Sequence, residues 1–318
     1  MRDFFPTEGY RFPPSEDMKS DVMERLENGV KELFETDQYK EFLKTMAKFH
    51  DYSLNNCILI SMQCPEATRV AGFRAWQEKF ERTVKKGEKG IRIISPRIRK
   101  EEVKDKNGNS KVEERISFGI GVVFDKNQTE GKEIVLDPFL IREENGCIEN
   151  FGEIKEALTT TARIPITFKE DLGGASGFFR RNEKDICIKS GMTEIDTIST
   201  LIHEIAHSRL HSDIKPLKER KATRGGLEVE AESISFVVSE YFGIDTSQSS
   251  FGYVASWSKG KELPELKGSL DIIKKESSEM IRDIEQNLLI GKIQTRATQE
   301  EPSIKEIQTV VQTNSRNR

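Results

Sequence analysis

The sequence predicts an α+β fold, in which N-terminal helices with a small antiparallel sheet precede a second helical region with a small sheet of its own. Two observations support this prediction. Apolar residues recur at helical spacing in several stretches of 10–27 residues, and shorter stretches between them have the composition of strands bounded by glycine and asparagine turns. We find no internal repeat. The 318 residues are therefore sufficient for two modest domains.

Composition excludes a membrane protein. Hydrophobic residues make up 35% of the chain, and no apolar run approaches the ~18 residues that a membrane-spanning helix needs. The N-terminal residues MRDFFPTEGYRFPPSED contain no secretory apolar region. We therefore expect a cytoplasmic protein with no membrane partner. Its four cysteines have no CxxC spacing, so we expect reduced thiols that pack as small apolar groups.

The N-terminal third is expected to be mainly helical after a flexible arm at residues 1–14. Ser15 can cap a helix whose apolar positions, Met18 to Phe34, recur every three or four residues. Two further helices are predicted at residues 38–49 and 53–63, and Pro65 ends the second of them.

A basic segment follows, in which Arg69 to Lys106 contains thirteen basic and six acidic residues. Phe73, Trp76 and Phe80 fit one face of a short helix, and residues 91–95 and 116–124 fit two strands of a long hairpin. Basic side chains beside exposed aromatic rings are what single-stranded nucleic acid requires. The alternative is that the three aromatic residues form a core and that the lysines only solubilise the surface.

Turn-rich residues around Asp137 and Asn145 favour a domain boundary there. Beyond it we expect a helix at 151–162, three short strands at 166–170, 175–180 and 185–189, and a last amphipathic helix at 264–290. The predicted domains cover residues 15–137 and 138–292, and a disordered tail follows at 293–318.

The sequence LIHEIAH at residues 201–207 carries the clearest chemical signal. His203 and His207 are four residues apart, so a helix would present both imidazoles on one face, where they can share a metal ion, normally zinc. Glu204 would then be placed to take a proton from metal-bound water, as in zinc peptidases. His211 continues the same face but lies about 12 Å of helix rise from His203, too far to share the ion. We expect it to be a helix-end cation or a substrate contact.

A third ligand should come from a separate segment, and residues 227–241 are the best source. We predict Glu228 as the ligand and Glu232, one turn later, as the acceptor for the free ring nitrogen of a ligating histidine. Glu230 or Glu232 could replace Glu228, and a solvated acidic helix start is the alternative. Tyr253 or His211 could stabilise an oxyanion.

These segments together resemble the ArdC-type antirestriction proteins found on conjugative elements, over roughly residues 40–290. The motifs that carry the resemblance are YSLNN (52–56), ATRVAGFRAWQ (67–77), VKKGEKGIRI (84–93), VVFDKNQTEG (122–131), HEIAH (203–207), EVEAES (228–233) and FGYVASW (251–257). The resemblance implies that residues 15–137 form a domain that binds single-stranded DNA. It implies that residues 138–292 form a zincin-like, zinc metallopeptidase-like domain related to the ImmA/IrrE peptidases, with a metal on His203, His207 and a glutamate of EVEAES. It also implies DNA contacts from the region of Asn55, Asn56, Arg69, Arg74, Trp76, Lys85, Lys86 and Lys89.

Two functions are therefore expected, from different classes. In the first, the chain is a zinc metalloendopeptidase that also binds single-stranded DNA and acts on an unknown protein substrate. In the second, it coats single-stranded DNA without catalysis, and its metal site is structural or vestigial. Loss of peptide cleavage on Glu204→Gln, with DNA binding retained, would separate them.

Overall fold

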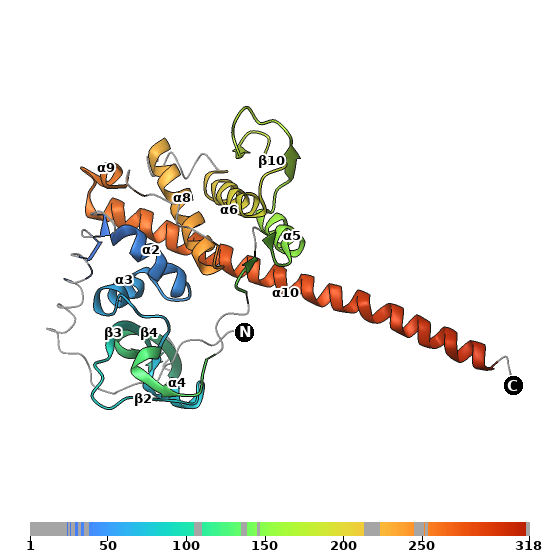
Figure 1. The fold of residues 1–318 in the computed structure, drawn as a ribbon. Coiled ribbons are helices and arrows are strands. Elements are labelled where there is room, and N and C mark those ends of the chain that lie inside the picture. Colours follow the sequence, from blue (N-terminus) through green and yellow to red (C-terminus); the bar gives the residue numbers. More distant parts are fainter. Residues whose placement is uncertain are drawn as a thin grey trace. The chain divides into compact units, whose positions relative to one another are not determined.

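The computed structural model describes residues 38–104, 110–134, 139–144, 147–212, 223–244 and 254–315, together with positions 24, 26, 29–30, 33–34 and 251 (Figure 1). Helices and small sheets alternate along the chain, so the predicted α+β class is confirmed. The chain divides into two compact units. Unit 1 comprises residues 1–138 and 249–274, and unit 2 comprises residues 139–248 and 275–318. Among the described helices, none has the length and apolar content that a bilayer span requires.

Unit 1 begins with two helices that bury an apolar core. These are α2 (Gln38–Lys48) and α3 (Leu54–Gln63), and both were predicted. Ser53 caps α3 by accepting a hydrogen bond from the Asn56 backbone N–H. Phe42, Leu43 and Met46 of α2 are completely buried. Most of the helix predicted to begin at Ser15 lies outside the described residues, although Leu26, Val30, Leu33 and Phe34 are buried.

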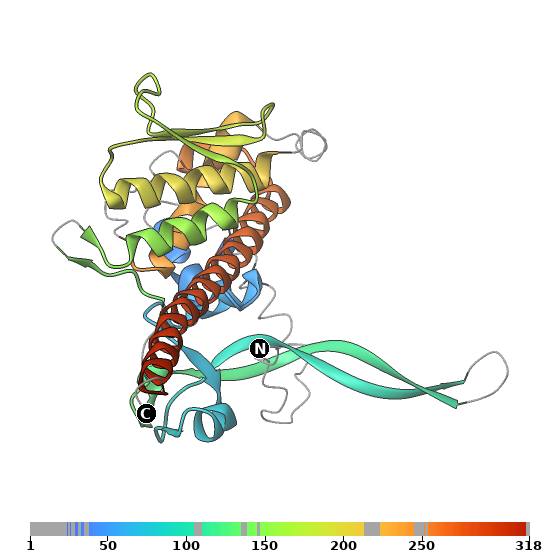
Figure 2. The same cartoon turned by 90° about the vertical axis from the view of Figure 1, so that its right-hand side faces the viewer.

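A three-stranded antiparallel sheet follows in the order β1-β4-β3, from β1 (Val70–Gly72), β3 (Ile91–Lys104) and β4 (Ser110–Asp125). The short helix α4 (Phe73–Glu78) follows β1, and β2 (Arg82–Val84) pairs with β5 (Thr129–Gly131), which follows the turn η1 (Lys126–Gln128). The hairpin of β3 and β4 is the long ribbon in Figure 2. Its pairing continues through the polar residues 99–104 and 110–115, where the sequence predicted only an excursion between strands.

Two amides of α3 satisfy the outer edge of β3. The side chain of Asn56 accepts a hydrogen bond from Ile94 N–H (2.8 Å) and donates one to Ile94 C=O (2.9 Å). Gln63, two helical turns later, does the same for Arg92 at 2.9 Å in each direction. The helix thus occupies the position of a further strand and protects this edge. Asn56 is buried and its amide both donates to and accepts from the backbone of Ile94, so a DNA contact by Asn56 conflicts with its position.

Replacing Asn56 with alanine should destabilise unit 1. The change leaves the N–H and C=O of Ile94 without their side-chain partners, which should cost about 2–3 kcal/mol of unfolding free energy. Urea denaturation of Asn56→Ala measures this loss. The neighbouring, half-buried Asn55 provides the control, since Asn55→Ala should change stability by less than ~1 kcal/mol. Equal stability of both variants would show that the amide does not hold the strand edge.

Unit 2 contains two small sheets and the helices around them. The two-stranded sheet is β6 (Glu143–Glu144) with β7 (Cys147–Ile148), and α5 (Phe151–Ala162) follows it as predicted. The second sheet has the order β8-β10-β9, from β8 (Ile166–Lys169), β9 (Gly177–Arg180) and β10 (Asp185–Lys189). β10 pairs with β8 in parallel and with β9 in antiparallel orientation. Among the four cysteines, Cys57 and Cys187 are buried as expected, whereas Cys147 is exposed on β7.

Two long helices of unit 2, α6 (Glu194–His211) and α8 (Arg224–Tyr241), pack against each other (Figure 1). Each begins at a threonine, Thr193 or Thr223, whose hydroxyl accepts a backbone N–H of the first turn. Both helices bury a continuous apolar stripe, which includes Leu201, Ile205, Ala231 and Ile234, each 0% exposed.

The short helix α9 (Val254–Ser258) precedes the last helix, α10 (Leu263–Ser315). The final helix includes most of residues 293–318, for which the composition predicted a disordered tail. Threonine, glutamine and serine reduce the apolar surface available for packing, but they do not exclude helical backbone.

Candidate metal centre and nucleic-acid interface

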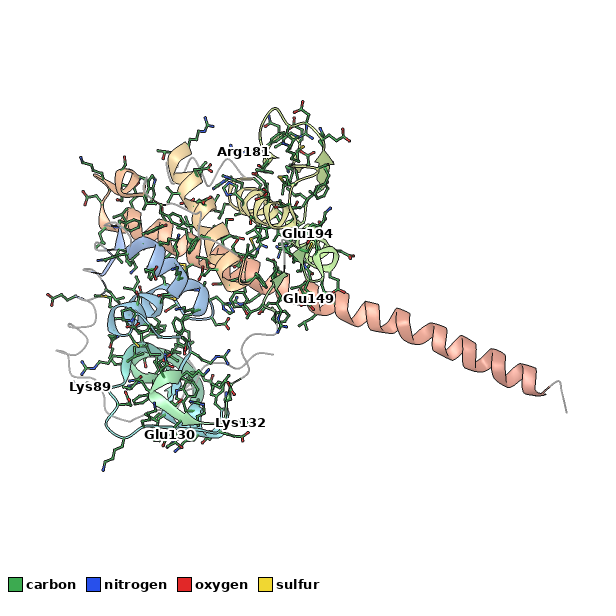
Figure 3. All side chains as sticks on the ribbon, viewed as in Figure 1. Lys89, Glu130, Lys132, Glu149, Arg181 and Glu194 are labelled. Carbon is green, nitrogen blue, oxygen red and sulfur yellow. The ribbon has the colours of Figure 1, made fainter. Side chains whose placement is uncertain are left out.

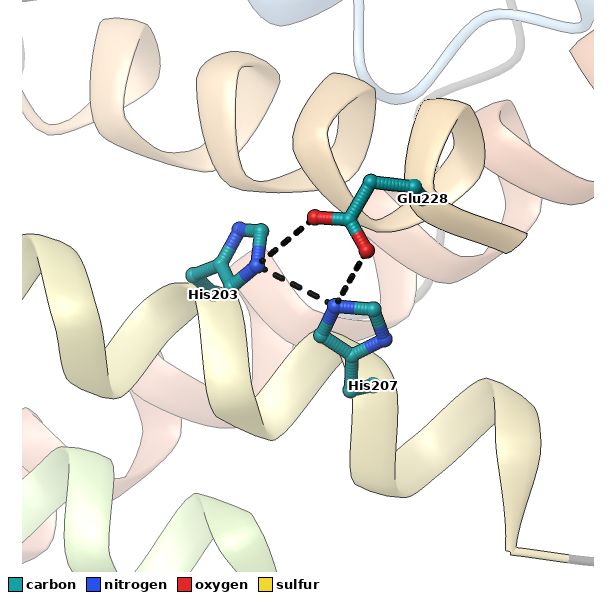
Figure 4. Close-up of side chains that lie close together, drawn as sticks. All are labelled: His203, His207 and Glu228. Carbon is teal, nitrogen blue, oxygen red and sulfur yellow. Dashed lines mark hydrogen bonds and ion pairs between the residues drawn. The ribbon is translucent and has the colours of Figure 1, made fainter. Parts of the chain in front are cut away.

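Three side chains of α6 and α8 converge between the two helices (Figure 4). His203 and His207 lie one turn apart on α6, and their Nε2 atoms are 3.1 Å apart. Glu228 of α8 lies opposite them, with one carboxylate oxygen 3.5 Å from His203 Nε2 and the other 3.5 Å from His207 Nε2. Within the described residues, this trio is the group of histidine, cysteine and acidic side chains whose ligand atoms gather closely enough to hold a metal ion.

The separations fit a divalent cation. Four ligands at 2.0–2.1 Å in a tetrahedron lie about 3.3 Å from one another, and the observed separations of 3.1, 3.5 and 3.5 Å bracket that value. Two imidazoles and one carboxylate are also a donor set found in metal sites that keep one position open. The residues present therefore fit the group that the sequence predicted.

Further side chains hold the outward nitrogens of both histidines. His203 Nδ1 lies 3.3 Å from a carboxylate oxygen of Glu232, the role predicted for that residue. His207 Nδ1 lies 3.0 Å from His211 Nδ1, and His211 Nε2 lies 3.9 Å from Glu230. Such contacts fix the orientation and tautomer of ligating imidazoles.

Of the two alternatives for His211, a substrate contact conflicts with its burial, since it is 2% exposed. Its ring lies against His207 Nδ1 in the last turn of α6. Glu230, which the sequence kept open as a substitute ligand, is 1% exposed and faces His211 rather than the centre. The i+4 spacing of His207 and His211 was visible in the sequence, but the partnership with Glu230 depends on the packing of α6 on α8. Tyr253 lies outside the described residues.

Glu204 follows the first ligand on α6 and is 7% exposed. Burial raises the pKa of its carboxyl, while the neighbouring His203 and His207 and a hydrogen bond from the backbone of Phe179 on β9 oppose that rise. A carboxylate whose pKa is raised toward neutrality is better suited to accept and return a proton. The contact with Phe179 was not foreseen, because no sequence pattern shows which strand lies beside the helix.

The acids around His203 raise its pKa to about 10 in the metal-free chain. Burial, the largest single effect, lowers the pKa, but Glu228, Glu232 and Glu204 together outweigh it. The same contacts with His203 and His207 hold the pKa of Glu228 well below its usual range. The opposite pKa shifts of His203 and Glu228 indicate that these two side chains favour each other's charged form.

We expect the stability of the metal-free protein to depend on this pairing. The raised pKa of His203 contributes stability that is full below pH 6.5, its ordinary pKa, and that is lost as pH rises through about 10. The lowered pKa of Glu228 contributes stability present above its ordinary value of 4.5, which is lost in acid. Urea denaturation of chelator-treated protein at pH 7 and 10 should show a loss that is smaller in His203→Gln. An equal loss in both proteins would contradict the pairing.

The residues predicted to contact DNA fall into two groups. Trp76 is 0% exposed, and its indole N–H donates to Phe124 C=O (2.9 Å), so a DNA contact by Trp76 conflicts with its burial. Ala71, Ala75, Phe80 and Phe124 pack around it. The core alternative that the sequence left open therefore holds for Trp76 and the partly buried Phe80, but not for Phe73, which is 42% exposed. The basic residues are accessible instead: Arg74, Lys85, Lys86 and Lys89 are exposed, and Arg69 and Asn55 are half-buried. Figure 3 shows Lys89 at the surface of unit 1.

In comparisons with known proteins, a family match lies within unit 1, and similarity to one relative extends over most of the chain. Residues 14–124 match the family model for the N-terminal domain of anti-restriction factor ArdC. An uncharacterized Bacillus anthracis protein, pXO2-81, is 27% identical over 332 residues that cover 91% of this chain and 55% of that protein. The chain thus spans about half the length of this relative. The ArdC-like match ends before the residues of the metal centre.

Two crystal structures of the antirestriction protein ArdC from plasmid R388 also resemble the chain. The metal-free structure has 19% identity and a TM-score of 0.47, and the similarity covers 75% of this chain and 85% of that one. For the Mn(II)-bound structure, the identity is 17%, the TM-score is 0.42 and the coverage is 79% of this chain and 98% of that one.

Proposed function

We propose that this chain, ArdC-like in its N-terminal part, is an antirestriction protein of a mobile element that binds single-stranded DNA through unit 1 and hydrolyses peptide bonds in unit 2. The observation that carries the enzymatic half is the triangle of His203, His207 and Glu228 with Glu204 beside it. The DNA half is supported by the family match over residues 14–124 and by the exposed lysines of the same unit.

His203 Nε2, His207 Nε2 and the Glu228 carboxylate would hold a divalent cation, and zinc suits this donor set. Zinc bound there supplies a Lewis acid and lowers the pKa of water toward 7. Glu204 Oε would accept the proton of the attacking water and pass it to the leaving amine. Glu232 and His211 would keep the imidazoles in the orientation that this chemistry needs.

The peptidase half is tested by Glu204→Gln. The amide keeps the size of the side chain but cannot accept the proton, so cleavage of a quenched peptide library should fall at least 100-fold while metal content stays at the wild-type level. The matched control is Glu240→Gln, a glutamate on α8 that lies outside the centre. No zinc-dependent cleavage by the wild-type chain would leave the second candidate, a DNA-coating protein with a structural metal.

The proposed binding of single-stranded DNA is tested by varying the salt concentration. The logarithm of the binding constant for a labelled single-stranded oligonucleotide should fall linearly with the logarithm of the salt concentration, with a slope of about −0.7 for each phosphate contacted. Replacing Lys85, Lys86 and Lys89 with alanine should make this slope less negative by about 2. The control triple variant replaces Lys169, Lys184 and Lys189, which are exposed lysines of unit 2. Affinity indifferent to salt would contradict phosphate contacts.

A further inference from the structure

One face of the β3–β4 hairpin carries exposed apolar side chains. Residues directly opposite each other share a face, and the register pairs Ile98 with Ile116, Pro96 with Phe118 and Arg92 with Val122. Phe118 is 69% exposed, Ile116 66%, Ile98 55% and Val122 38%. On β4, Ile116 and Phe118 are two residues apart, ~7 Å along the strand, and Val122 follows after the half-buried Ile120. We call this row, together with Phe73, the arm stripe.

Phe73 of α4 extends the arm stripe toward the core of unit 1. Its ring lies edge-on to Phe124, with ring centroids 6.3 Å apart, and it is 42% exposed. Phe124 is the next residue after Val122 on the same face of β4. Among the described strands, β1 pairs with β4 only over Val123–Asp125, so the hairpin beyond is a two-stranded ribbon (Figure 2).

The opposite face of the ribbon differs in chemistry. The Arg97 guanidinium lies over Gly119, where a side chain would collide with it, and donates to Ile120 C=O. Ser95 lies beside Gly121 in the same way. Over residues 95–97 and 117–121, small and polar residues therefore close this face, whereas large apolar residues remain open on the other. An open apolar row of this kind on one side of a thin ribbon indicates a binding surface.

The surrounding charge decides which ligand fits. Lys85, Lys86 and Lys89 are exposed in the turn that leads into β3, and the exposed Arg92 is directly opposite Val122 in the arm stripe. Residues 85–92 contain four basic residues and one acid, Glu88, whose carboxylate accepts a hydrogen bond from Gln128. A ligand for this surface combines negative charge with flat apolar groups. Unpaired nucleotides have this combination, and a duplex hides the apolar part of it.

We propose that Phe118 and Phe73 are the stacking platforms for unpaired bases, and that phosphates lie toward Lys85, Lys86, Lys89 and Arg92. The proposal rests on single-strand binding as the function of unit 1 and names the residues that discriminate single from double strands. Trp76, the aromatic residue that the sequence favoured for this role, supports the platform from within the core.

Phe118→Trp places a fluorescent reporter on the arm stripe. Trp76 is fully buried, but the second tryptophan, Trp257 of α9, is half-buried, so the signal of position 118 is read as the difference in emission between the variant and the wild-type protein. Oligo(dT) longer than the ~4–16 nucleotides of a single-strand site should quench the new emission, and the same sequence as a duplex should leave it unchanged. Unchanged emission, while anisotropy of a labelled oligonucleotide shows binding, would overturn the proposal.

Affinity variants give an independent readout. Phe118→Ala should weaken oligo(dT) binding about 10-fold, Phe118→Leu should weaken it to a similar extent, and Phe118→Tyr should retain it. Phe168→Ala, at an exposed phenylalanine of unit 2, is the control and should bind like wild type. If Phe118→Leu retains affinity, the contact is not stacking and the proposal fails.

Two other results would point elsewhere. A shift from dimer to monomer in Phe118→Ala by sedimentation, without a change in DNA affinity, would assign the arm stripe to a second copy of the chain and overturn the proposal. Wild-type protein that does not bind oligo(dT) would contradict the proposed function of unit 1 itself.

Discussion

The His207→Ala variant should lose the stabilisation that zinc gives the wild-type chain. Ligand binding to the folded state alone adds about 2.7 kcal/mol at a free zinc concentration 100 times the Kd. Removing one of three protein ligands should weaken zinc binding by at least ~100-fold, which abolishes most of that gain. Thermal unfolding of chelator-treated protein, with and without added zinc, measures the difference.

The fourth histidine of the chain provides the control for this variant. His50 lies in unit 1, so His50→Gln should keep the full zinc-dependent increase in unfolding temperature. A His207→Ala protein that zinc stabilises as strongly as wild type would show that the ion, if any, binds elsewhere.

Trp76→Ala should destabilise unit 1 by about 3–5 kcal/mol. The substitution removes a completely buried indole from the cluster with Phe80 and Phe124, and it deletes the hydrogen bond to Phe124 C=O. Urea denaturation, followed by circular dichroism because the variant lacks the Trp76 fluorophore, measures the loss. Gln77→Ala, at the exposed neighbour on α4, should stay within ~0.5 kcal/mol of wild type. A loss below ~1 kcal/mol in Trp76→Ala would contradict its role in the core.

The helices and the metal centre could be predicted because their sequence signals are local. Apolar periodicity located α2, α3 and α5 to within a residue or two. The four-residue spacing of His203 and His207 determined their common face, and helical spacing then separated Glu228 from Glu230 on α8. These relations follow from the geometry of a single helix, whereas the approach of Glu228 to His203 and His207 depends on the packing of α8 against α6.

The aromatic residues could not be assigned in this way. Both α4 and β4 have apolar residues on one face, and an apolar face ordinarily packs inward. Which face is covered depends on the elements that lie over it. β1 and α4 cover the end of β4 at Val123 and Phe124 and leave Phe118 exposed. Trp76 points from α4 toward Phe124 and is buried there. That outcome depends on tertiary arrangement, which alternation along a strand does not encode.

The length of the β3–β4 hairpin was also underestimated, for a related reason. Residues 99–115 are mostly charged, and charge usually indicates a loop. Cross-strand backbone hydrogen bonds do not require burial, so the ladder continues to the pair Lys104 and Ser110. Patterns of apolar residues predict the parts of a sheet that pack against a core. They do not predict strands that extend beyond the core, such as the charged end of this hairpin.

The central claim is that two imidazoles and one carboxylate hold a single divalent ion. X-ray absorption of chelator-stripped protein reloaded with one equivalent of zinc tests it most directly. The account predicts full loading with a first shell of two histidine nitrogens and oxygens only, and loss of the histidine signal in the double variant of His203 and His207 to alanine. Sulfur in the first shell, or incomplete uptake of one equivalent by the wild-type chain, would contradict it.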